Sequence, residues 1–371
     1  YSQSRRSNSG TRALDPTYVE TALDRELVPA VLAGEFRLVV ISGNAGDGKT
    51  AFLQKLEARA QGEGAIIDRS VANGCRFEFQ GRIYQSNYDG SQDEGDDTRD
   101  EEPRAFLGPF AGSDAASWPS DQVRLIAINE GRLVDFLSTE AATFPLLAKV
   151  VSEGFVTGQP EHGVAVINLN LRSVVTDPLG YEDDPKGGDE SILARLVRRM
   201  THENFWEPCQ RCDLRDKCYA FHNARTFQDE TAGPKVTERL KSLYTLTHLR
   251  GRLHMTLRDL RSALAFMLVG TRDCGEIHDL YRSGDRDQIA QDFYLNSWLG
   301  GTAPNADRLL SLLREVDIGL ASDPKLDRSL DFVSPTADHS LFRFGERGSY
   351  DREVLRRLFE DLPREFTGKL S

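Results

Sequence analysis

Residues 36–53 read FRLVVISGNAGDGKTAFL, the segment around which the rest of the chain is organised. An apolar, β-branched run at 38–41 meets a glycine-rich segment, 43–50, that matches the pattern G-x-x-x-x-G-K-S/T at every fixed position. The segment AFLQKLEARA that follows has the composition of a helix. The pattern therefore predicts a buried strand, a tight loop and the start of a helix. A chance match would give only a glycine-rich loop with an exposed lysine, and the flanking strand and helix argue against it.

The loop has the chemistry of a nucleoside-triphosphate site. Glycines let backbone N–H groups curl around a phosphate, and a helix start offers unpaired N–H groups and a positive dipole end. We expect Lys49 to bridge the β- and γ-phosphates of ATP and the Thr50 hydroxyl to bind Mg²⁺. The residues predicted to bind the nucleotide are Gly43, Asn44, Ala45, Gly46, Asp47, Gly48, Lys49, Thr50 and Ala51.

Two later apolar runs end in polar side chains. The run at 123–128 leads to Asn129 and Glu130, and the run at 164–167 leads to Asn168 and Asn170. We expect Glu130 to act as the general base on the attacking water, and Asn129 to accept a hydrogen bond from a Mg²⁺-bound water without adding charge. Either Asn168 or Asn170 is expected to hold that attacking water. The alternative is that these residues only end their strands, because asparagine is common at turns.

The remaining segments suggest the rest of an α/β domain. Residues 16–34 have helical apolar spacing and serve either as packing or as a lid over the adenine. Residues 65–68 are predicted to form the second strand, which implies a parallel sheet, and 75–84 to form a hairpin arm. Residues 131–155 are predicted to form one helix.

This order of segments, over residues 16–175, resembles the core of AAA+ and STAND-type ATPases. The sequences NEGRL at 129–133 and TLRDLRSAL at 256–264 are similar to ATPases of bacterial defence and signalling systems, including the restriction ATPase that acts with DNA phosphorothioation. The resemblance implies ATP hydrolysis, nucleotide-linked assembly and a helical lid near 256–269, from which Arg258 or Arg261 would reach the γ-phosphate. The absence of an N/T-K-x-D motif favours ATP over GTP. The alternative for the two arginines is an ordinary solvated helix face.

A cysteine cluster follows the predicted ATPase core. Cys209, Cys212, Cys218 and His222 form the pattern C-x2-C-x5-C-x3-H, whose four side chains suit a tetrahedral, structural Zn²⁺. Three cysteines at this spacing also occur around iron–sulfur clusters, and there Cys75 or Cys274 would have to complete the set. The third alternative is three free cysteines packed together without a metal.

Charge is unevenly distributed along the chain. The net charge is −12, and the segment 84–103 carries eight carboxylates against Arg99 alone, a local charge of −7. Such a run is typical of a solvated loop, and the alternatives are a partner-facing or Mg²⁺-attracting loop. Residues 192–261 carry 14 basic and 8 acidic side chains, a local charge of +6, so an anionic partner such as nucleic acid is expected to meet this stretch.

The sequence thus predicts an α/β fold, a P-loop NTPase parallel sheet flanked by helices, followed by a mostly helical domain with a metal-binding cysteine cluster. The predicted divisions are a linker at 1–15, the core at 16–185 with the acidic insert at 84–103, a helix and metal module at 186–233, and a helical lid and C-terminal helical domain at 234–371.

The polar opening and the missing initial Met suggest a linker from a larger protein, whose other subunits or domains are expected partners. The sequence shows no signal peptide and no apolar run near the ~18 residues of a membrane span, so we expect a cytoplasmic protein that makes no membrane contact. Nucleotide-dependent oligomers are expected. Two alternative functions are a non-hydrolysing nucleotide switch and a nucleic-acid-binding module.

Overall fold

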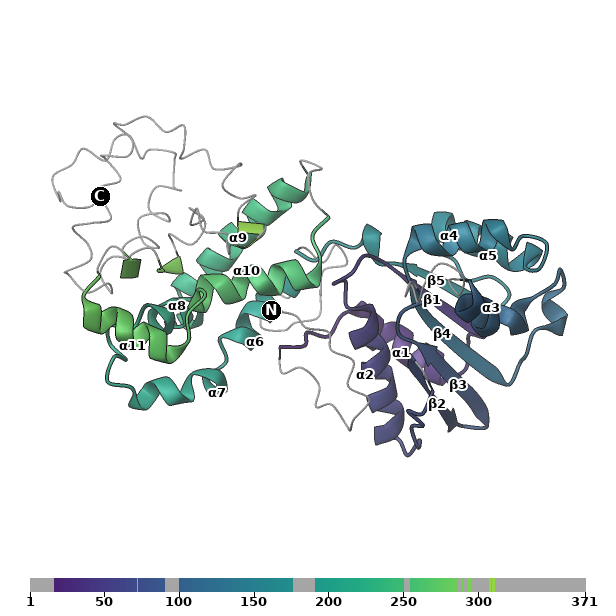
Figure 1. Cartoon of the computed structure of the whole chain (residues 1–371), viewed down its shortest axis with the longest axis horizontal. Coiled ribbons are helices and arrows are strands. Elements are labelled where there is room, and N and C mark those ends of the chain that lie inside the picture. The colour runs from purple at the N-terminus through teal and green to yellow at the C-terminus, as the bar shows by residue number, and fades with distance from the viewer. Residues whose placement is uncertain are drawn as a thin grey trace. The chain divides into compact units, whose positions relative to one another are not determined.

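The computed structural model describes residues 17–71, 73–90, 100–175, 191–249 and 254–285, with further positions at 288–289, 292–294, 307 and 309–310. The chain divides into two compact units, Tyr1–Arg172 and Ser173–Ser371 (Figure 1). The predicted linker at 1–15, the middle of the acidic insert and most of the helices predicted beyond 288 lie outside the described residues.

The first unit contains a five-stranded, mostly parallel sheet. Its strand order is β2-β3-β4-β1-β5, in which only β2 runs antiparallel to its neighbour. The strands are β1 (Leu38–Ser42), β2 (Gly74–Phe79), β3 (Arg82–Asn87), β4 (Gln122–Ile128) and β5 (Val164–Asn168). The α/β class that the sequence predicts is therefore confirmed.

The strand that precedes the glycine-rich loop lies inside the sheet, between β4 and β5. Residues 38–41 are all fully buried, which is typical of a strand covered on both faces. The last residue of β1, Ser42, pairs with Ile128 of β4 and Asn168 of β5. The carboxyl ends of three adjacent parallel strands therefore meet at one edge of the sheet.

Helices cover both faces of this sheet (Figure 1). Val39 and Ile41 of β1 point into one apolar core, and Leu38 and Val40 point into the other, because successive side chains of a strand alternate. The first core lies under η1 (Leu23–Leu27), α1 (Val28–Leu32) and α2 (Lys49–Gly62). The second lies under α3 (Glu101–Leu107), η2 (Gly108–Phe110), η3 (Ala115–Ser117), α4 (Glu130–Thr139) and α5 (Pro145–Thr157).

The prediction of a second strand at 65–68 is wrong. In that segment only Asp68 forms a bridge, with Arg76, and the Ile66 side chain is 89% exposed. The strand that follows α2 is instead β2, which forms with β3 the hairpin that the sequence places at 75–84. A short apolar run could not distinguish a strand from an extended connection.

Two further boundaries differ from the prediction. The single helix expected at 131–155 is two helices, since α4 ends at Thr139 and α5 begins at Pro145, a residue that starts helices well but cannot continue them. The acidic insert is not a loop throughout, because its first residues belong to β3 and its last belong to α3.

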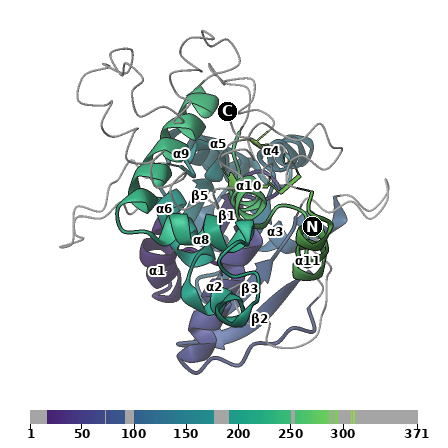
Figure 2. The same cartoon turned by 90° about the vertical axis from the view of Figure 1, so that its left-hand side faces the viewer.

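The described part of the second unit is helical, as predicted. Figure 2 shows α6, α8, α9 and α10 grouped together, and each of these helices packs against at least one of the others. The helices are α6 (Ile192–Met200), α7 (Glu203–Trp206), η5 (Glu207–Arg211), α8 (Tyr219–Gln228), α9 (Ala232–Leu249), α10 (Leu257–Val269) and α11 (Cys274–Ser283). A capping box between Thr256 and Asp259 begins α10. Across the residues described in both units, no helix is at once long and apolar enough to cross a membrane.

Candidate functional site

The glycines at 43–48 adopt conformations that a side chain would disturb. Gly46 has φ of 108° and Gly48 has φ of 90°, both in the left-handed region. A Cβ atom on Gly43 would lie 2.9 Å from a carboxylate oxygen of Asp47 and 2.9 Å from the Cβ of Leu169. These three positions explain why the loop needs glycine.

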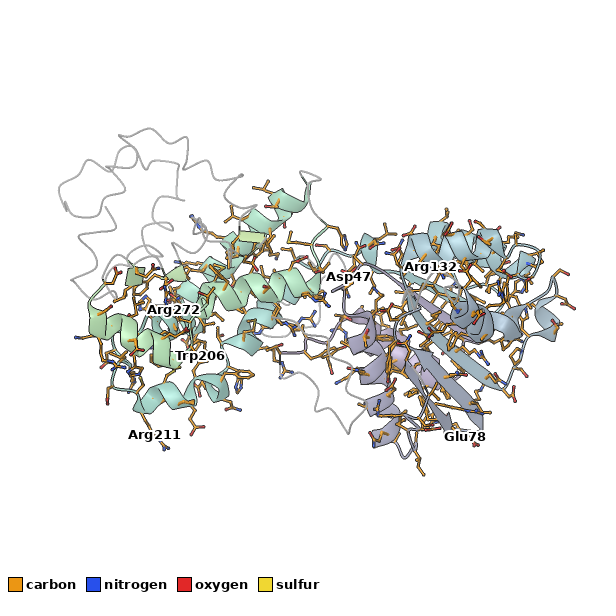
Figure 3. The ribbon with its side chains drawn as sticks, in the orientation of Figure 1. Asp47, Glu78, Arg132, Trp206, Arg211 and Arg272 are labelled. Atoms are coloured by element: carbon orange, nitrogen blue, oxygen red, sulfur yellow. The ribbon has the colours of Figure 1, made fainter. Side chains whose placement is uncertain are left out.

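The loop is held in shape by Asp47, which Figure 3 labels near the start of α2. This side chain is buried, and its carboxylate accepts a 2.6 Å hydrogen bond from the Asn44 N–H. Arg172 donates to the Asp47 carbonyl oxygen at 2.8 Å. Asp47 therefore orders the loop from within, and Arg172 supports it from beyond β5.

Lys49 and Thr50 open α2 at the end of the loop. The Lys49 ammonium donates to the carbonyl oxygens of Gly43 at 2.7 Å and Asn44 at 2.9 Å, so it folds back over the loop. The Thr50 hydroxyl donates to the Tyr88 carbonyl oxygen at 3.2 Å. No side-chain hydrogen bond caps the start of this helix. Ala45 lies exposed at the loop, and Ala51 is half-buried in the first turn.

The structure brings together three of the polar residues predicted at the strand ends. Glu130 is the first residue of α4, and its carboxylate accepts hydrogen bonds from the side-chain amides of Asn168 at 3.1 Å and Asn170 at 3.3 Å. Asn168 ends β5, and Asn170 lies in the short helix η4 (Leu169–Leu171) that follows. Because β4 and β5 flank β1, this cluster lies at the edge of the sheet where the glycine-rich loop begins.

The fourth residue of that set, Asn129, has a structural contact. It is the N-cap of α4, and its amide oxygen accepts from the Arg132 N–H at 3.4 Å. Asparagine is a favoured N-cap because its side chain satisfies one of the unpaired N–H groups at a helix start. Arg132, labelled in Figure 3, pairs with Asp100 at 2.7 Å. The side-chain oxygen of Asn129, which the sequence predicts to face a Mg²⁺-bound water, thus stabilises the start of α4.

A polar cluster at the end of β3 was not predicted from the sequence. Asn87 is buried and donates to the Glu102 carboxylate at 2.9 Å. Asn73 donates to the same oxygen at 3.0 Å and to the Asp89 carbonyl oxygen at 2.9 Å. Asp89 also follows Tyr88, the residue whose carbonyl accepts from Thr50. The sequence does not reveal this cluster, because carboxylates in such an acidic run normally face solvent.

A second unpredicted network holds α2 against the hairpin. Glu57 of α2 is fully buried, and its carboxylate accepts from Tyr88 at 2.7 Å, Arg69 at 3.0 Å and Ser86 at 3.1 Å. Burial raises the pKa of the nearby Cys75 thiol to about 12, with a further contribution from the Glu57 charge. Cys75 is therefore an unreactive thiol within the core of the first unit.

The N-terminal helix packs against α2, the helix that begins at Lys49. It contains a π-helical turn, η1, a form that often occurs at functional sites. The Tyr18 hydroxyl donates to Asp24, and the Lys55 ammonium of α2 lies 5.7 Å from the centre of the Tyr18 ring. Burial, followed by the Asp24 hydrogen bond, raises the pKa of Tyr18, and the Arg172 charge opposes that rise. These contacts fit either packing or a lid over a bound base.

The predicted metal ligands lie in the second unit. Cys209 belongs to η5, Cys212 follows it, Cys218 is the N-cap of α8, and His222 lies one turn into α8. The His222 ring packs against Phe293, with 5.4 Å between ring centres. No group of three or more His, Cys, Asp or Glu side chains in the described ranges is placed to hold a metal ion. The predicted set is therefore not assembled, and a metal there stays a prediction.

The arginines predicted to reach a γ-phosphate lie on α10. Arg258 is exposed and Arg261 is half-buried. Other basic residues of this unit also face solvent, including Arg211, which Figure 3 labels. Their roles in nucleotide or nucleic-acid binding stay predictions.

Comparison of this chain with family models, with curated proteins and with solved structures found no match.

Proposed function

We propose that the first unit binds ATP with Mg²⁺ and hydrolyses it. The observation that carries the proposal is the combination of a left-handed glycine loop leading into Lys49 with a carboxylate, Glu130, held by two asparagines at the same sheet edge. In open α/β sheets, ligands bind at the carboxyl ends of the strands.

The residues around the loop fit a triphosphate. The start of α2 is free of a side-chain cap, so its first N–H groups can bind an anion, and the helix dipole favours negative charge there. Lys49 already lies over the loop, and exchanging carbonyl partners for phosphate oxygens would need only a movement of its flexible side chain. Thr50 would bind Mg²⁺, which supplies charge neutralisation on the phosphates.

Glu130 is proposed as the general base. A carboxylate acts on an attacking water by accepting its proton or polarising it, and its position must be fixed for that purpose. Asn168 and Asn170 fix one carboxylate oxygen, Oε2, through both of their amide groups. In this proposal the two asparagines position Glu130, in place of the role in holding the attacking water that the sequence suggests.

The larger role follows from the sequence resemblance. We propose that ATP turnover drives a conformational change or an assembly step in a bacterial defence or signalling system, with partner subunits or further domains. A second candidate is a non-hydrolysing nucleotide switch. Asn129 favours it, because this residue brings no negative charge to Mg²⁺ and its amide oxygen caps α4.

The proposal is tested by ATP binding to a Lys49→Ala variant. Loss of the ammonium should bring affinity for a fluorescent ATP analogue below detection, because charge-assisted contacts to phosphate are the strong ones. A matched control is Lys149→Ala, since Lys149 is an exposed residue of α5 that pairs only loosely with Glu153, at 3.8 Å. Unchanged affinity in Lys49→Ala would refute nucleotide binding at this loop.

A further inference from the structure

We propose that the second unit binds one structural Zn²⁺ through four thiolates, those of Cys209, Cys212, Cys218 and Cys274, with His278 donating a hydrogen bond to the Cys212 sulfur. Cys274 replaces His222 in the ligand set that the sequence spacing suggests. The site would join the segment 209–218 to α11.

The segment 209–218 folds into successive turns. The Cys212 N–H donates to the Cys209 carbonyl at 3.2 Å, and the Cys218 N–H donates to the Leu214 carbonyl at 2.7 Å. These turns let cysteines separated by up to nine residues approach one another. Cys218 is the N-cap of α8, where the helix dipole stabilises a thiolate.

The helix α11 supplies the fourth thiol. A capping box between Asp273 and Glu276 makes Cys274 its first residue. His278 lies one turn later, on the same face, because residues four apart in a helix are neighbours. The His278 Nε2 atom lies 3.3 Å from the Cys212 sulfur. This contact places the face of α11 that carries Cys274 against the cysteine segment.

Tyr281 fixes α11 in that position. Its hydroxyl accepts a 3.0 Å hydrogen bond from the Tyr219 N–H and donates to the Lys217 carbonyl. Both partners flank Cys218 directly. The helix that carries Cys274 is therefore held beside Cys218 by contacts that do not involve sulfur.

The electrostatics of the cysteines agree with this grouping. Burial raises the pKa of Cys209, and the charges of Cys218, Cys274 and Cys212 raise it further. Burial likewise raises the pKa of Cys218, and the charges of Cys212 and Cys274 add to that rise. The four cysteines therefore lie close enough together for their charges to interact.

The other candidate ligands have different surroundings. His222 packs against Phe293, and Cys75 is buried against Ser86 in the sheet of the first unit. Within the described ranges no trio of side chains is yet placed to hold an ion, so closing the site requires the thiols to turn about their side-chain bonds. Zn²⁺ suits the result, because four thiolates form a closed tetrahedral site with no open position for catalysis.

Two measurements on the full chain, purified under reducing conditions, test this proposal. Elemental analysis should find about one zinc per chain, and X-ray absorption at the zinc edge should find four sulfur ligands at about 2.3 Å. A protein with no bound zinc, an iron-containing protein, or three sulfurs with one nitrogen would overturn it. The absorption measurement needs no variant, so it does not depend on whether a mutant folds.

Variants give an independent readout. Cys274→Ser should lose most of the zinc and release the remainder faster to a chromogenic chelator, while His222→Ala, a matched control from α8, should keep it. Zinc retained in Cys274→Ser but lost in His222→Ala would overturn the assignment of the fourth ligand.

Discussion

The two units of this chain assemble their candidate sites in different ways. In the first unit, Glu130, Asn168 and Asn170 come from two strand ends and are already joined by hydrogen bonds. In the second, the cysteines come from one irregular segment and one distant helix. The contact that joins the two is the one between the Cys212 sulfur and the His278 ring. The first site is set by a hydrogen-bonded sheet, and the second by helix packing.

This difference between the two units shows where sequence patterns determine a site. A parallel sheet forces the carboxyl ends of neighbouring strands to one edge, so polar residues that end strands meet there. Helices carry no such rule, because each helix can present any face to its neighbours. We therefore expect the first site to respond sharply to single substitutions, and the proposed zinc site to depend on the ion that would close it.

The largest effect is expected from Glu130→Gln. If Glu130 is the base, turnover should fall by about 10²-fold or more, because general-base assistance is typically worth ~10²–10⁴. ATP affinity should be kept, since glutamine has the same shape and removes a negative charge near the phosphates. Phosphate release and analogue binding measure the two quantities.

Glu153→Gln is the matched control for this change, because Glu153 is an exposed residue of α5. If Glu130→Gln hydrolysed ATP at the wild-type rate, the base would lie elsewhere. Asp89 would then be the next carboxylate to change, since it follows the carbonyl that accepts from Thr50.

A smaller effect is expected from Asn168→Ala. A hydrogen bond to a charged group is worth roughly 1.5–3 kcal/mol, so turnover should fall by roughly 10- to 100-fold while ATP affinity is unchanged. The double variant Glu130→Gln/Asn168→Ala should be no slower than Glu130→Gln alone, because the asparagine acts through the carboxylate. If the two losses of turnover instead multiplied in the double variant, Asn168 would act directly on the reaction.

The smallest effect is expected from Thr256→Ala, which tests how the second unit is held together. Loss of the capping box at the start of α10 should lower the free energy of unfolding by about 1 kcal/mol in chemical denaturation. Ser262→Ala, on an exposed position of the same helix, should change it little. Equal effects from the two variants would contradict a stabilising cap.

The sequence predicted much of the first unit because its strands are strongly apolar and end in recognisable residues. The loop, the ends of β4 and β5 and the hairpin follow from local patterns. The segment 65–68 was misassigned because apolar composition alone cannot reveal that Ile66 faces solvent. The break at Pro145 was missed because the apolar spacing continues through it.

The remaining features depend on contacts between segments far apart in the chain. Asn87 and Glu102 meet because α3 returns to the end of β3. His278 reaches Cys212 because α11 packs beside the start of α8. His222 had the better spacing in the sequence, but its ring faces Phe293. Spacing rules favour nearby residues, so the sequence offers Cys274 only as one of two residues that could complete an iron–sulfur set. The packing of α11 is what favours it in the proposed zinc site.

Whether the first unit turns over ATP is decided by the rate at which the wild-type chain releases phosphate from ATP in the presence of Mg²⁺, measured beside Lys49→Ala. We expect a wild-type rate clearly above the variant's background, because Glu130 is in place beside the loop that Lys49 completes. A wild-type rate equal to that background, in a protein that still binds the ATP analogue, would contradict hydrolysis and establish the nucleotide switch instead.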